Sequence, residues 1–572
     1  MEKIKKLRNK FKLYQLDGYI IPKNDEYFSE YVPHHKDNLK YISNFTGSYG
    51  IALILKSENI LLVDGRYTVQ ANNQSGSDFK ILTLPLCKKD LPKINGKRIG
   101  YDPRIFNEGT IKRFKKLLNI NFFPITDNLI NFSKKKIYSE KKKLNFYLLN
   151  KNISGISNLR KLQDIKRYLI KNNYDLIFVT SPENVAWLLN IRGEDSDFSP
   201  IPNSRLIMDK KMNIFLFCDL NKINKNLKKK LYFLKLIDIE DLDEFLLRIK
   251  NKQFSIDKIS CSIFYINLII KNNLILNKSD PIYYLKSIKN NIEIKNTIKA
   301  HEYDGAALTK FIFWVKKNYE KKKITEISAQ NKLFEFKKKC KKFKNLSFPT
   351  ISSTGSNGAI VHYNATNKTN KTLKKGNLYL VDSGGQYYFG TTDVTRTISL
   401  GSKNKRIKEI FTRVLQGHLN LTNYKVTEKT TGSELDQIAR KNLKKINLDY
   451  SHGTGHGVGF FLNVHEGPQS ISKFNKIKLK PGMILSNEPG YYKKGEFGLR
   501  IENLIFLKKK NNKKKFYNLT YVPIDKSLII KKLMNKNEIA WLNEYHKIVY
   551  TKLKKYMNNE ELVLLKQYCS NI

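Results

Sequence analysis

Cysteine is scarce in this chain, and the few cysteines are not spaced for crosslinking. The 572 residues include five cysteines, an odd number, and no two of them form a CxxC pair. A disulfide framework and a zinc knuckle both need cysteines at short, paired spacings. Neither is therefore expected, and a reducing compartment suits the chain.

Long apolar runs are also missing. No hydrophobic stretch approaches the roughly 20 residues that a helix needs to cross a bilayer. The first 22 residues are basic but lack the continuous apolar stretch of a secretory signal peptide. We therefore expect a cytoplasmic protein that has no membrane partner.

Acidic residues are few relative to basic ones, 51 against 105, which gives a formal net charge of +54. Such a charge favours a nucleic-acid or other polyanion partner. However, the lysines are spread along the whole chain together with abundant asparagine and isoleucine, as a coding bias toward AT-rich codons would produce. We favour this bias and expect no specific nucleic-acid partner, although nonspecific binding at low salt is expected.

The length and pattern of the chain predict several domains. Alternating β-rich and helical stretches indicate two α/β domains at residues 1–150 and 151–290, joined through a lysine-rich linker near 134–143. Their similar order of elements suggests that the two domains are related. A long helical pattern followed by paired β-rich runs fills residues 291–509, and residues 510–572 form a tail that ends in an amphipathic helix.

The last third of the chain contains four carboxylates and one imidazole that could together bind two metal ions. Carboxylates can bridge neighbouring divalent ions, and this mixture of ligands suits Mn(II), Co(II), Fe(II) or Zn(II). The five candidates are Asp382, Asp393, His456, Glu488 and Glu502.

The two aspartates are weak evidence taken singly. Asp382 ends the apolar run NLYLVD, and the SGGQ that follows would permit a tight reversal. Asp393 lies eleven residues later in a second β-rich run. An aspartate at a strand end is usually a turn or cap residue, but if these strands pair, both carboxylates can face one cavity.

The histidines give a stronger signal. The chain has only nine histidines, and three of them cluster at His452, His456 and His465. Glycines on both sides of His456 would remove side chains that obstruct a metal cluster, and they would permit unusual backbone angles. A lone histidine is usually a satisfied core residue, but this clustering favours a functional role.

The two glutamates complete the set. Glu488 precedes Pro489, which should end a strand just beyond it. Glu502 lies in GLRIENLIFL, which predicts a buried strand, where a glutamate is costly unless it is paired or bound to metal. Neutralisation by Arg500 on the same strand face is the structural alternative.

At these motifs the chain resembles the pita-bread metallopeptidases, the family of methionine aminopeptidase, prolidase and Xaa-Pro aminopeptidase. It is most similar to the long, three-domain Xaa-Pro aminopeptidases (aminopeptidase P) through DGYIIPKNDEYFSEY, VDGRYTVQA, ENVAWLLNIRGED and HGTGHGVGFFLNVHEGP. The resemblance implies an α/β plus α+β architecture: two creatinase-like N-terminal α/β domains, a pita-bread catalytic domain and a C-terminal extension packed on that domain. It also implies a homodimer.

The resemblance assigns two divalent metal ions per chain, with Mn(II) as the expected metal. Asp382 and Asp393 would hold one ion, His456 and Glu488 the other, and Asp393 and Glu502 would bridge the pair. Every ligand of the family pattern is present in this sequence.

The same resemblance assigns roles beyond the metals. His362 would contact the substrate near the scissile bond, and His465 would stabilise the tetrahedral intermediate. His452 would line the pocket for the penultimate proline, and Arg500 would stand beside the last bridging ligand. Glu488 is the candidate for carrying a proton to the departing nitrogen.

The expected function is hydrolysis of the N-terminal Xaa-Pro bond of peptides through a metal-bridging hydroxide. The nearest alternative is a prolidase, which cleaves only Xaa-Pro dipeptides. A polyanion-binding protein that reuses the fold is a second alternative, suggested by the charge. Creatinase-like chemistry without metals is disfavoured because all five ligands are retained.

Overall fold

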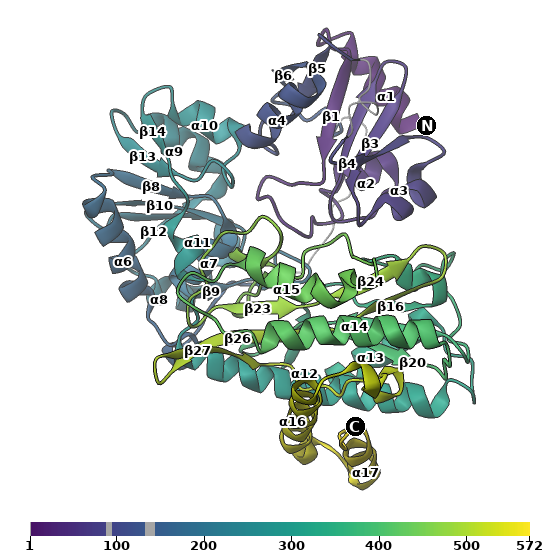
Figure 1. The fold of residues 1–572 in the computed structure, drawn as a ribbon. Coiled ribbons are helices and arrows are strands. Elements are labelled where there is room, and N and C mark those ends of the chain that lie inside the picture. Colours follow the sequence, from purple (N-terminus) through teal and green to yellow (C-terminus); the bar gives the residue numbers. More distant parts are fainter. Residues whose placement is uncertain (1, 87–93, 132–143) are drawn as a thin grey trace. The chain divides into compact units, whose positions relative to one another are not determined.

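The computed structural model describes residues 2–86, 94–131 and 144–572, which divide into two compact units (Figure 1). Unit 1 comprises Met1–Lys151 and Ile156–Tyr283, and unit 2 comprises Asn152–Gly155 and Tyr284–Ile572. Unit 1 contains most of both expected α/β domains, since only residues 152–155 and 284–290 of the second belong to unit 2, and the domain limits at residues 150, 290 and 509 stay predictions. The expected linker at 134–143 lies outside the described residues. Within the described ranges, no helix combines the length and apolarity that crossing a membrane requires.

Unit 1 begins with a mixed six-stranded sheet in the order β4-β3-β2-β1-β5-β6. Strand β1 runs antiparallel to β2 and parallel to β5. The strands are β1 (Gly18–Pro22), β2 (Ile51–Leu55), β3 (Asn59–Asp64), β4 (Lys80–Leu84), β5 (Arg98–Tyr101) and β6 (Asn121–Pro124). The associated helices are α1 (Glu2–Phe11), α2 (Asn38–Ser43), α3 (Thr68–Ser75) and α4 (Glu108–Leu118).

The central strands of this sheet are apolar throughout because both faces of the sheet are covered. Ile20 belongs to the core on one face and Ile21 to the core on the other, since neighbouring side chains in a strand point to opposite faces. Buried strands of this kind appear in the sequence as continuous hydrophobic runs such as IALIL in β2.

A second six-stranded sheet in unit 1 repeats this topology in the order β12-β11-β10-β8-β13-β14. Each pairing matches its counterpart in direction: β8 is antiparallel to β10 and parallel to β13. The strands are β8 (Leu176–Val179), β10 (Ser204–Asp209), β11 (Ile214–Cys218), β12 (Lys235–Asp238), β13 (Gln253–Ile256) and β14 (Leu274–Asn277), with helices α6 (Asn158–Lys171), α7 (Pro182–Leu189), α9 (Leu242–Arg248) and α10 (Ile263–Ile269). The expected relation between the two α/β domains is therefore confirmed at the level of strand order.

Unit 2 combines several small antiparallel sheets with long helices. The expected long helix is α12, which begins at a capping box formed by Asn290 and Glu293. The helices are α12 (Asn291–Asn318), α13 (Glu326–Lys338), α14 (Lys405–Thr422), α15 (Gly432–Lys444), α16 (Lys536–Leu553) and α17 (Asn559–Tyr568). The strands nearest the candidate ligands are β16 (Ile351–Thr354), β17 (Leu378–Ser383), β18 (Gly385–Tyr387), β19 (Gly390–Thr391), β20 (Val394–Ser399), β21 (Gly455–Gly457), β22 (Glu466–Ile471), β23 (Ile484–Asn487), β24 (Gly490–Lys493), β25 (Phe497–Arg500), β26 (Asn503–Lys510) and β27 (Lys513–Asn518).

The tight reversal predicted after Asp382 does not occur there. The SGGQ segment instead leads into β18, and the chain reverses at residues 388–389 before β19. In this turn Phe389 has a positive φ of 116°, a strained conformation for a residue other than glycine. The Asp382 and Asp393 strands are thus separated by a small hairpin.

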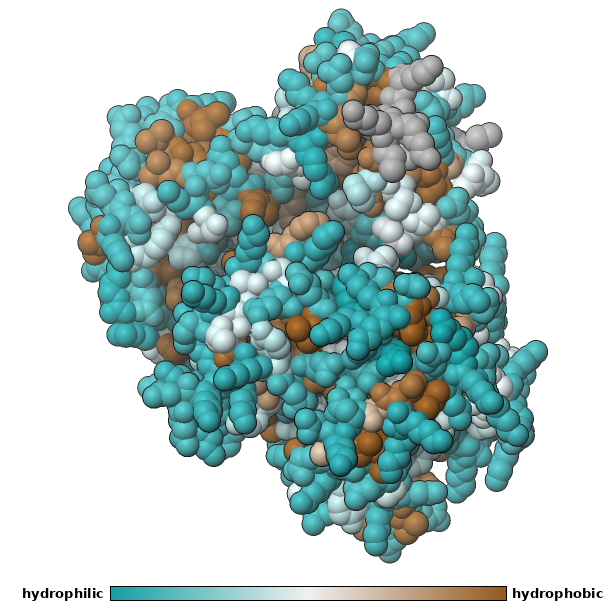
Figure 2. Space-filling view, viewed as in Figure 1, coloured by the Kyte–Doolittle hydropathy of each residue, from teal (hydrophilic) through white to brown (hydrophobic). Residues whose placement is uncertain are grey.

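Hydrophilic side chains cover most of the face shown in Figure 2. One lysine-rich run of the sequence forms the exposed end of the β26–β27 hairpin. There the register places Lys508 opposite Lys515 and Lys510 opposite Lys513. These lysines lie on a solvated hairpin, as the coding-bias interpretation expects.

Packing of α14 on α15 should be sensitive to a single methyl group. A Cβ at Gly417 of α14 would lie 2.1 Å from the backbone oxygen of Ala439 in α15, so Gly417→Ala must separate the two helices. We expect a loss of about 1–3 kcal/mol in the free energy of unfolding, measured by chemical denaturation. Gly109→Ala in α4 is the control, because the nearest atom to its Cβ lies 3.6 Å away. Equal stability of Gly417→Ala and wild type would contradict this account.

Candidate metal centre

Strand pairing brings the two aspartates to one place. Strands β17 and β20 pair antiparallel, with Asp382 opposite Thr395. Asp393 immediately precedes β20, so this residue lies beside the strand that contains Asp382. Both aspartates are buried, at 8% and 4% exposure. The predicted pairing of these two strands is therefore confirmed.

His456 lies on β21, between β22 and β23, and the unusual backbone angles predicted for its glycine neighbours do not occur. Neither glycine has a positive φ. A Cβ at Gly455 would lie 1.9 Å from the oxygen of Ser486, and one at Gly457 would lie 2.1 Å from the oxygen of Glu466. The glycines therefore permit close backbone approach to the flanking strands, which fixes the strand that presents the imidazole.

Hydrogen bonds orient the His456 ring toward the carboxylates. Its Nδ1 is 2.8 Å from the Gly457 oxygen, which leaves Nε2 as the ligand atom. Nε2 is 3.4 Å from Asp393 Oδ2 and 3.6 Å from Glu488 Oε1. Burial alone would lower the pKa of His456, but the hydrogen bond with Asp393 and the charge of Glu488 raise it to about 9.

The two glutamates enter from chain segments between strands. Glu488 directly follows β23, as the sequence predicts, and its Oε1 accepts a hydrogen bond from Ser486 Oγ at 3.1 Å. Glu502 lies between β25 and β26, not inside a continuous strand as predicted. The chain leaves the β24–β25 hairpin at this point and enters a different sheet. Glu502 Oε2 accepts a hydrogen bond from Thr395 Oγ1 at 2.7 Å.

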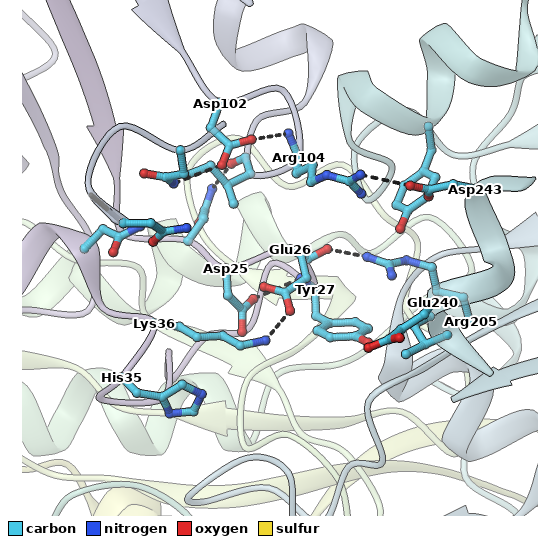
Figure 3. A pocket seen from close by; sticks show the side chains of 17 residues that line it. Asp25, Glu26, Tyr27, His35, Lys36, Asp102, Arg104, Arg205, Glu240 and Asp243 are labelled. Atoms are coloured by element: carbon cyan, nitrogen blue, oxygen red, sulfur yellow. Dashed lines mark hydrogen bonds and ion pairs between the residues drawn. The ribbon is translucent and has the colours of Figure 1, made fainter. Parts of the chain in front are cut away.

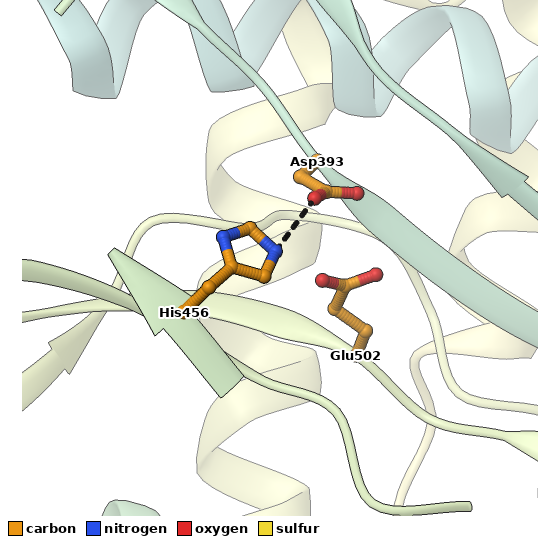
Figure 4. Close-up of side chains that lie close together, drawn as sticks. All are labelled: Asp393, His456 and Glu502. Atoms are coloured by element: carbon orange, nitrogen blue, oxygen red, sulfur yellow. Dashed lines mark ion pairs between the residues drawn. The ribbon is translucent and has the colours of Figure 1, made fainter. Parts of the chain in front are cut away.

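Three of the five candidates form a compact group, shown in Figure 4. Ligand atoms of Asp393, His456 and Glu502 all lie within 4.8 Å of one another. Among the described residues this is the one group of three or more histidine, cysteine or acidic side chains with that geometry. Glu488 adjoins it through His456. Asp382 interacts electrostatically with Asp393 and Glu488.

Three carboxylates at this site, those of Asp382, Glu488 and Glu502, resist ionisation in the absence of added cations. Burial, opposed by the charge of Arg500 and reinforced by that of Asp393, raises the pKa of Asp382 to about 7. Burial, and then the charge of Asp393, holds the pKa of Glu502 well above its ordinary value. Burial also raises the pKa of Glu488. Divalent cations would offset both the burial and the mutual repulsion.

One atom in the cluster has an unmet bonding capacity. Asp382 Oδ1 is buried and has no hydrogen-bond partner among the residues described. An unpaired buried carboxylate oxygen is costly unless a cation approaches it. The donor set of carboxylate oxygens and one imidazole nitrogen therefore fits the implied pair of divalent metals.

Arg500 forms its ion pair with Asp382 and not with Glu502, as the structural alternative supposed, although its charge also lowers the pKa of Glu502. Its Nη2 pairs with Asp382 Oδ2 at 2.7 Å, and its Nε donates to Thr395 Oγ1 at 3.0 Å. Its Nη1 donates to the Tyr492 hydroxyl at 2.6 Å. Arg500 is 1% exposed, so these contacts hold the carboxylates in place from behind.

Two residues of this network, Thr395 and Tyr492, were not predicted. A signal for Thr395 existed, because it lies two residues after Asp393, a spacing that keeps side chains on one face of a strand. Tyr492 gave none, since an aromatic residue in a hairpin usually packs in a core. Its hydroxyl also lies 2.9 Å from Nε2 of His452, which links that histidine to Arg500.

The remaining predicted histidines lie around the cluster in different settings. The His465 ring is exposed and meets the His456 ring edge-on, with 4.3 Å between centroids. His362 is half-buried on a loop between β16 and β17. The approach of His362 to the cluster stays a prediction.

A buried glutamate that sequence reasoning missed anchors the His362 loop. Glu326, at the start of α13, is fully buried and accepts hydrogen bonds from the Tyr363 hydroxyl at 2.8 Å and the Thr354 backbone at 2.8 Å. It also accepts from Asn357 Nδ2 at 2.9 Å and the Lys371 backbone at 2.9 Å. These partners come from both ends of the loop, so one carboxylate fixes its path.

Family comparisons cover almost the whole chain. Residues 295–509 match Metallopeptidase family M24, and residues 514–572 match the C-terminal region of peptidase_M24. Residues 3–131 and 139–293 each match a Creatinase/Prolidase N-terminal domain.

Full-length relatives are similar over the same extent. The chain is 36% identical to Xaa-Pro aminopeptidase 1 of Dictyostelium discoideum, over 96% of this chain and 93% of that protein. It is 33% identical to a probable Xaa-Pro aminopeptidase P of Laccaria bicolor, over 100% and 93% of the two chains.

Solved structures are also similar to this chain. The X-prolyl aminopeptidase of Caenorhabditis elegans, described as a cytosolic enzyme with a di-nuclear active site, superposes with a TM-score of 0.92 at 28% identity. That match covers 100% of this chain and 99% of the other. The prolidase of Pyrococcus furiosus is 26% identical, with a TM-score of 0.51, over 62% of this chain and 98% of its own.

The raised carboxyl pKa values predict how pH affects the metal-stripped protein. Asp382 has a pKa of 3.8 unfolded and about 7 folded, so its protonated form contributes stability below pH 3.8 that is lost as the pH rises through about 7. Glu502, shifted in the same direction, adds to this loss. Glu502→Gln removes one such group, so the variant should lose less stability over this range in chemical denaturation with a chelator.

Added Mn(II) gives the complementary measurement. It should raise the melting temperature of wild type by mass action and should raise that of Glu502→Gln much less. Glu496→Gln, an exposed glutamate in the adjacent hairpin, is the control and should behave as wild type. An equal pH profile and an equal response to Mn(II) in Glu502→Gln would refute this account of the cluster.

Proposed function

The chain belongs to the Xaa-Pro aminopeptidases of metallopeptidase family M24, and from this premise we propose that it removes the N-terminal residue from peptides with proline in second place. The observation that carries the proposal is the compact group of Asp393, His456 and Glu502, with Glu488 adjoining and Asp382 behind it. The similarity over the full length, including both N-terminal domains, favours the aminopeptidase over the shorter prolidases.

The residues that would hold two divalent ions are those predicted from the sequence. Asp382 and Asp393 would hold one ion, His456 and Glu488 the other, and Asp393 and Glu502 would bridge them. When bound, the ions would supply Lewis acidity and would lower the pKa of a water molecule enough to give hydroxide at neutral pH. Arg500 and Thr395 keep Asp382 and Glu502 in fixed orientations, so little reorganisation is needed during the reaction.

The surrounding side chains handle the substrate. His465, whose exposed ring contacts the His456 ring, would donate a hydrogen bond to the carbonyl oxygen of the first residue as charge develops there. His362 would contact the peptide near the scissile bond from its own loop. Glu488, 19% exposed, would carry a proton from the attacking water to the proline nitrogen as the C–N bond breaks.

Two parts of the site would select the substrate, one by its free N-terminus and the other by its proline. The acidic cluster would attract the free α-amine of the substrate, which limits cleavage to the first bond. His452 and Tyr492, linked at 2.9 Å, would line the space for the proline ring. Proline lacks an N–H, so a pocket that recognises ring shape suits it better than one that needs a hydrogen bond.

Three further features belong to this proposal. Mn(II) is the expected metal, as the family resemblance implies. The protein is expected to be a homodimer in the cytoplasm. The Caenorhabditis elegans relative is described as cytosolic, which supports that location.

Peptide cleavage tests the proposal directly. Metal-stripped protein should release arginine from Arg-Pro-Pro only after Mn(II) is added. Glu488→Ala should lower kcat by at least about 100-fold, because general acid-base groups contribute factors of this size. Glu496→Ala changes an exposed glutamate of the neighbouring hairpin and should retain wild-type rates. Release of arginine is measured by chromatography.

A length series separates the two peptidases. The aminopeptidase cleaves Arg-Pro-Pro in preference to the dipeptide Arg-Pro. A preference for the dipeptide would identify a prolidase. No cleavage of either peptide with any divalent ion would overturn the proposal.

A further inference from the structure

Unit 1 contains a cavity of about 680 Å³ that has no part in the chemistry above (Figure 3). Its volume falls in the range of small-molecule sites, about 300–1,000 Å³. Both α/β halves of the unit contribute to its walls. Asp25 and Asp102 come from the first half, and Arg205, Glu240 and Tyr265 come from the second.

The cavity is placed where open α/β sheets bind ligands. Asp25 and Asp102 follow the carboxyl ends of β1 and β5, which are adjacent and parallel. Glu240 follows the carboxyl end of β12, and Arg205 stands at the start of β10, which runs antiparallel to β11 beside it. In both sheets, therefore, the cavity lies at the edge where the parallel strands have their carboxyl ends. This edge forms the ligand-binding crevice of such sheets.

The charge of the cavity is opposite to that of the chain. Five acidic and three basic side chains line it, although basic residues outnumber acidic ones by 105 to 51 in the whole sequence. Lys36 pairs with Glu26, and Arg104 pairs with Asp243 at 2.9 Å. The acidic wall residues are Asp25, Glu26, Asp102, Glu240 and Asp243.

Two fully buried wall residues have unused polar atoms of opposite charge. Asp25 is 2% exposed; its Oδ1 accepts from the backbone of Tyr27 and Ser29, and its Oδ2 has no partner among the described residues. Arg205 is also 2% exposed and is held between the rings of Tyr27 and Tyr265, at 4.5 and 4.6 Å. Its Nε has no hydrogen-bond acceptor within the described part of the chain.

We propose that this cavity binds a free amino acid with a basic side chain. The Asp25 carboxylate would receive the α-ammonium group, and the Arg205 guanidinium would bind the carboxylate. The acidic excess on the walls, with Glu240 exposed, would favour a ligand with net positive charge. The carboxylates here are not gathered as metal ligands are, since the one such group in the described residues is the cluster of Asp393, His456 and Glu502.

The experiment titrates the full-length protein with three matched probes by calorimetry. L-Arginine has both charged groups, agmatine lacks the carboxylate, and 5-guanidinopentanoate lacks the α-amine. We expect L-arginine to bind at least about tenfold more tightly than either analogue, the factor that one charge-assisted hydrogen bond provides.

Variants locate the site. Asp25→Asn keeps the Oδ1 acceptor that holds the turn and removes the charge, so it should weaken L-arginine binding by at least about tenfold. Asp127→Asn, an exposed aspartate beside wall residue Asn128, should leave binding unchanged. Glu240→Gln, at an exposed wall position, should weaken binding and decides the question if Asp25→Asn does not fold. Glu488→Ala should bind L-arginine as wild type does, because the cavity is remote in sequence and belongs to unit 1.

Several outcomes would overturn the proposal. They are no binding of L-arginine, equal binding of agmatine, unchanged binding by folded Asp25→Asn, or loss of binding in Glu488→Ala. The last result would assign the amino acid to the metal centre. Because the readout is binding and not cleavage, failure here leaves the proposed peptidase activity standing, and failure of that activity leaves this site standing.

Discussion

Repulsion between buried carboxylates is the constraint around which unit 2 is built. Four acidic side chains and one imidazole meet in an interior where each charge would be costly alone. The structure accommodates them by taking them from separate segments and by giving them neutral or cationic supports. Arg500 pairs with Asp382, Thr395 bonds to Glu502, and Ser486 bonds to Glu488. These supports leave part of the repulsion between the carboxylates uncompensated, and bound cations would remove it.

A candidate ligand set could be predicted from the sequence because chemistry of this kind needs particular residue types, and the structure brings Asp393, His456 and Glu502 of that set together. Carboxylates in apolar surroundings and a histidine between glycines are unusual enough to be noticed one residue at a time. The supports were harder to predict, because Thr395, Tyr492 and Glu326 are ordinary residue types whose importance depends on partners far along the chain. Glu326, for example, bonds to Thr354 and Lys371, and only the folded loop brings these together.

Local pattern also failed where backbone geometry decides. The glycines around His456 were expected to permit unusual backbone angles, but neither has a positive φ, and neighbouring strands pass within contact distance of both. The strand predicted through Glu502 is two strands, since the chain changes sheets at that residue. A hydrophobic pattern in the sequence cannot distinguish one long strand from two strands that follow each other closely. By contrast, the long α12 was predictable from its helical periodicity, and the apolar strands of unit 1 were predictable from their short, continuous hydrophobic runs.

The β26–β27 hairpin illustrates an effect of register that the net charge does not reveal. Lys508 faces Lys515 and Lys510 faces Lys513, and all four are exposed. Like charges directly opposite each other destabilise a strand pair. Counter-ions screen such repulsion over about 10 Å at 0.1 M salt. Rising ionic strength weakens most surface ion pairs. At the end of this hairpin it should instead weaken a repulsion and so stabilise the pairing of the two strands.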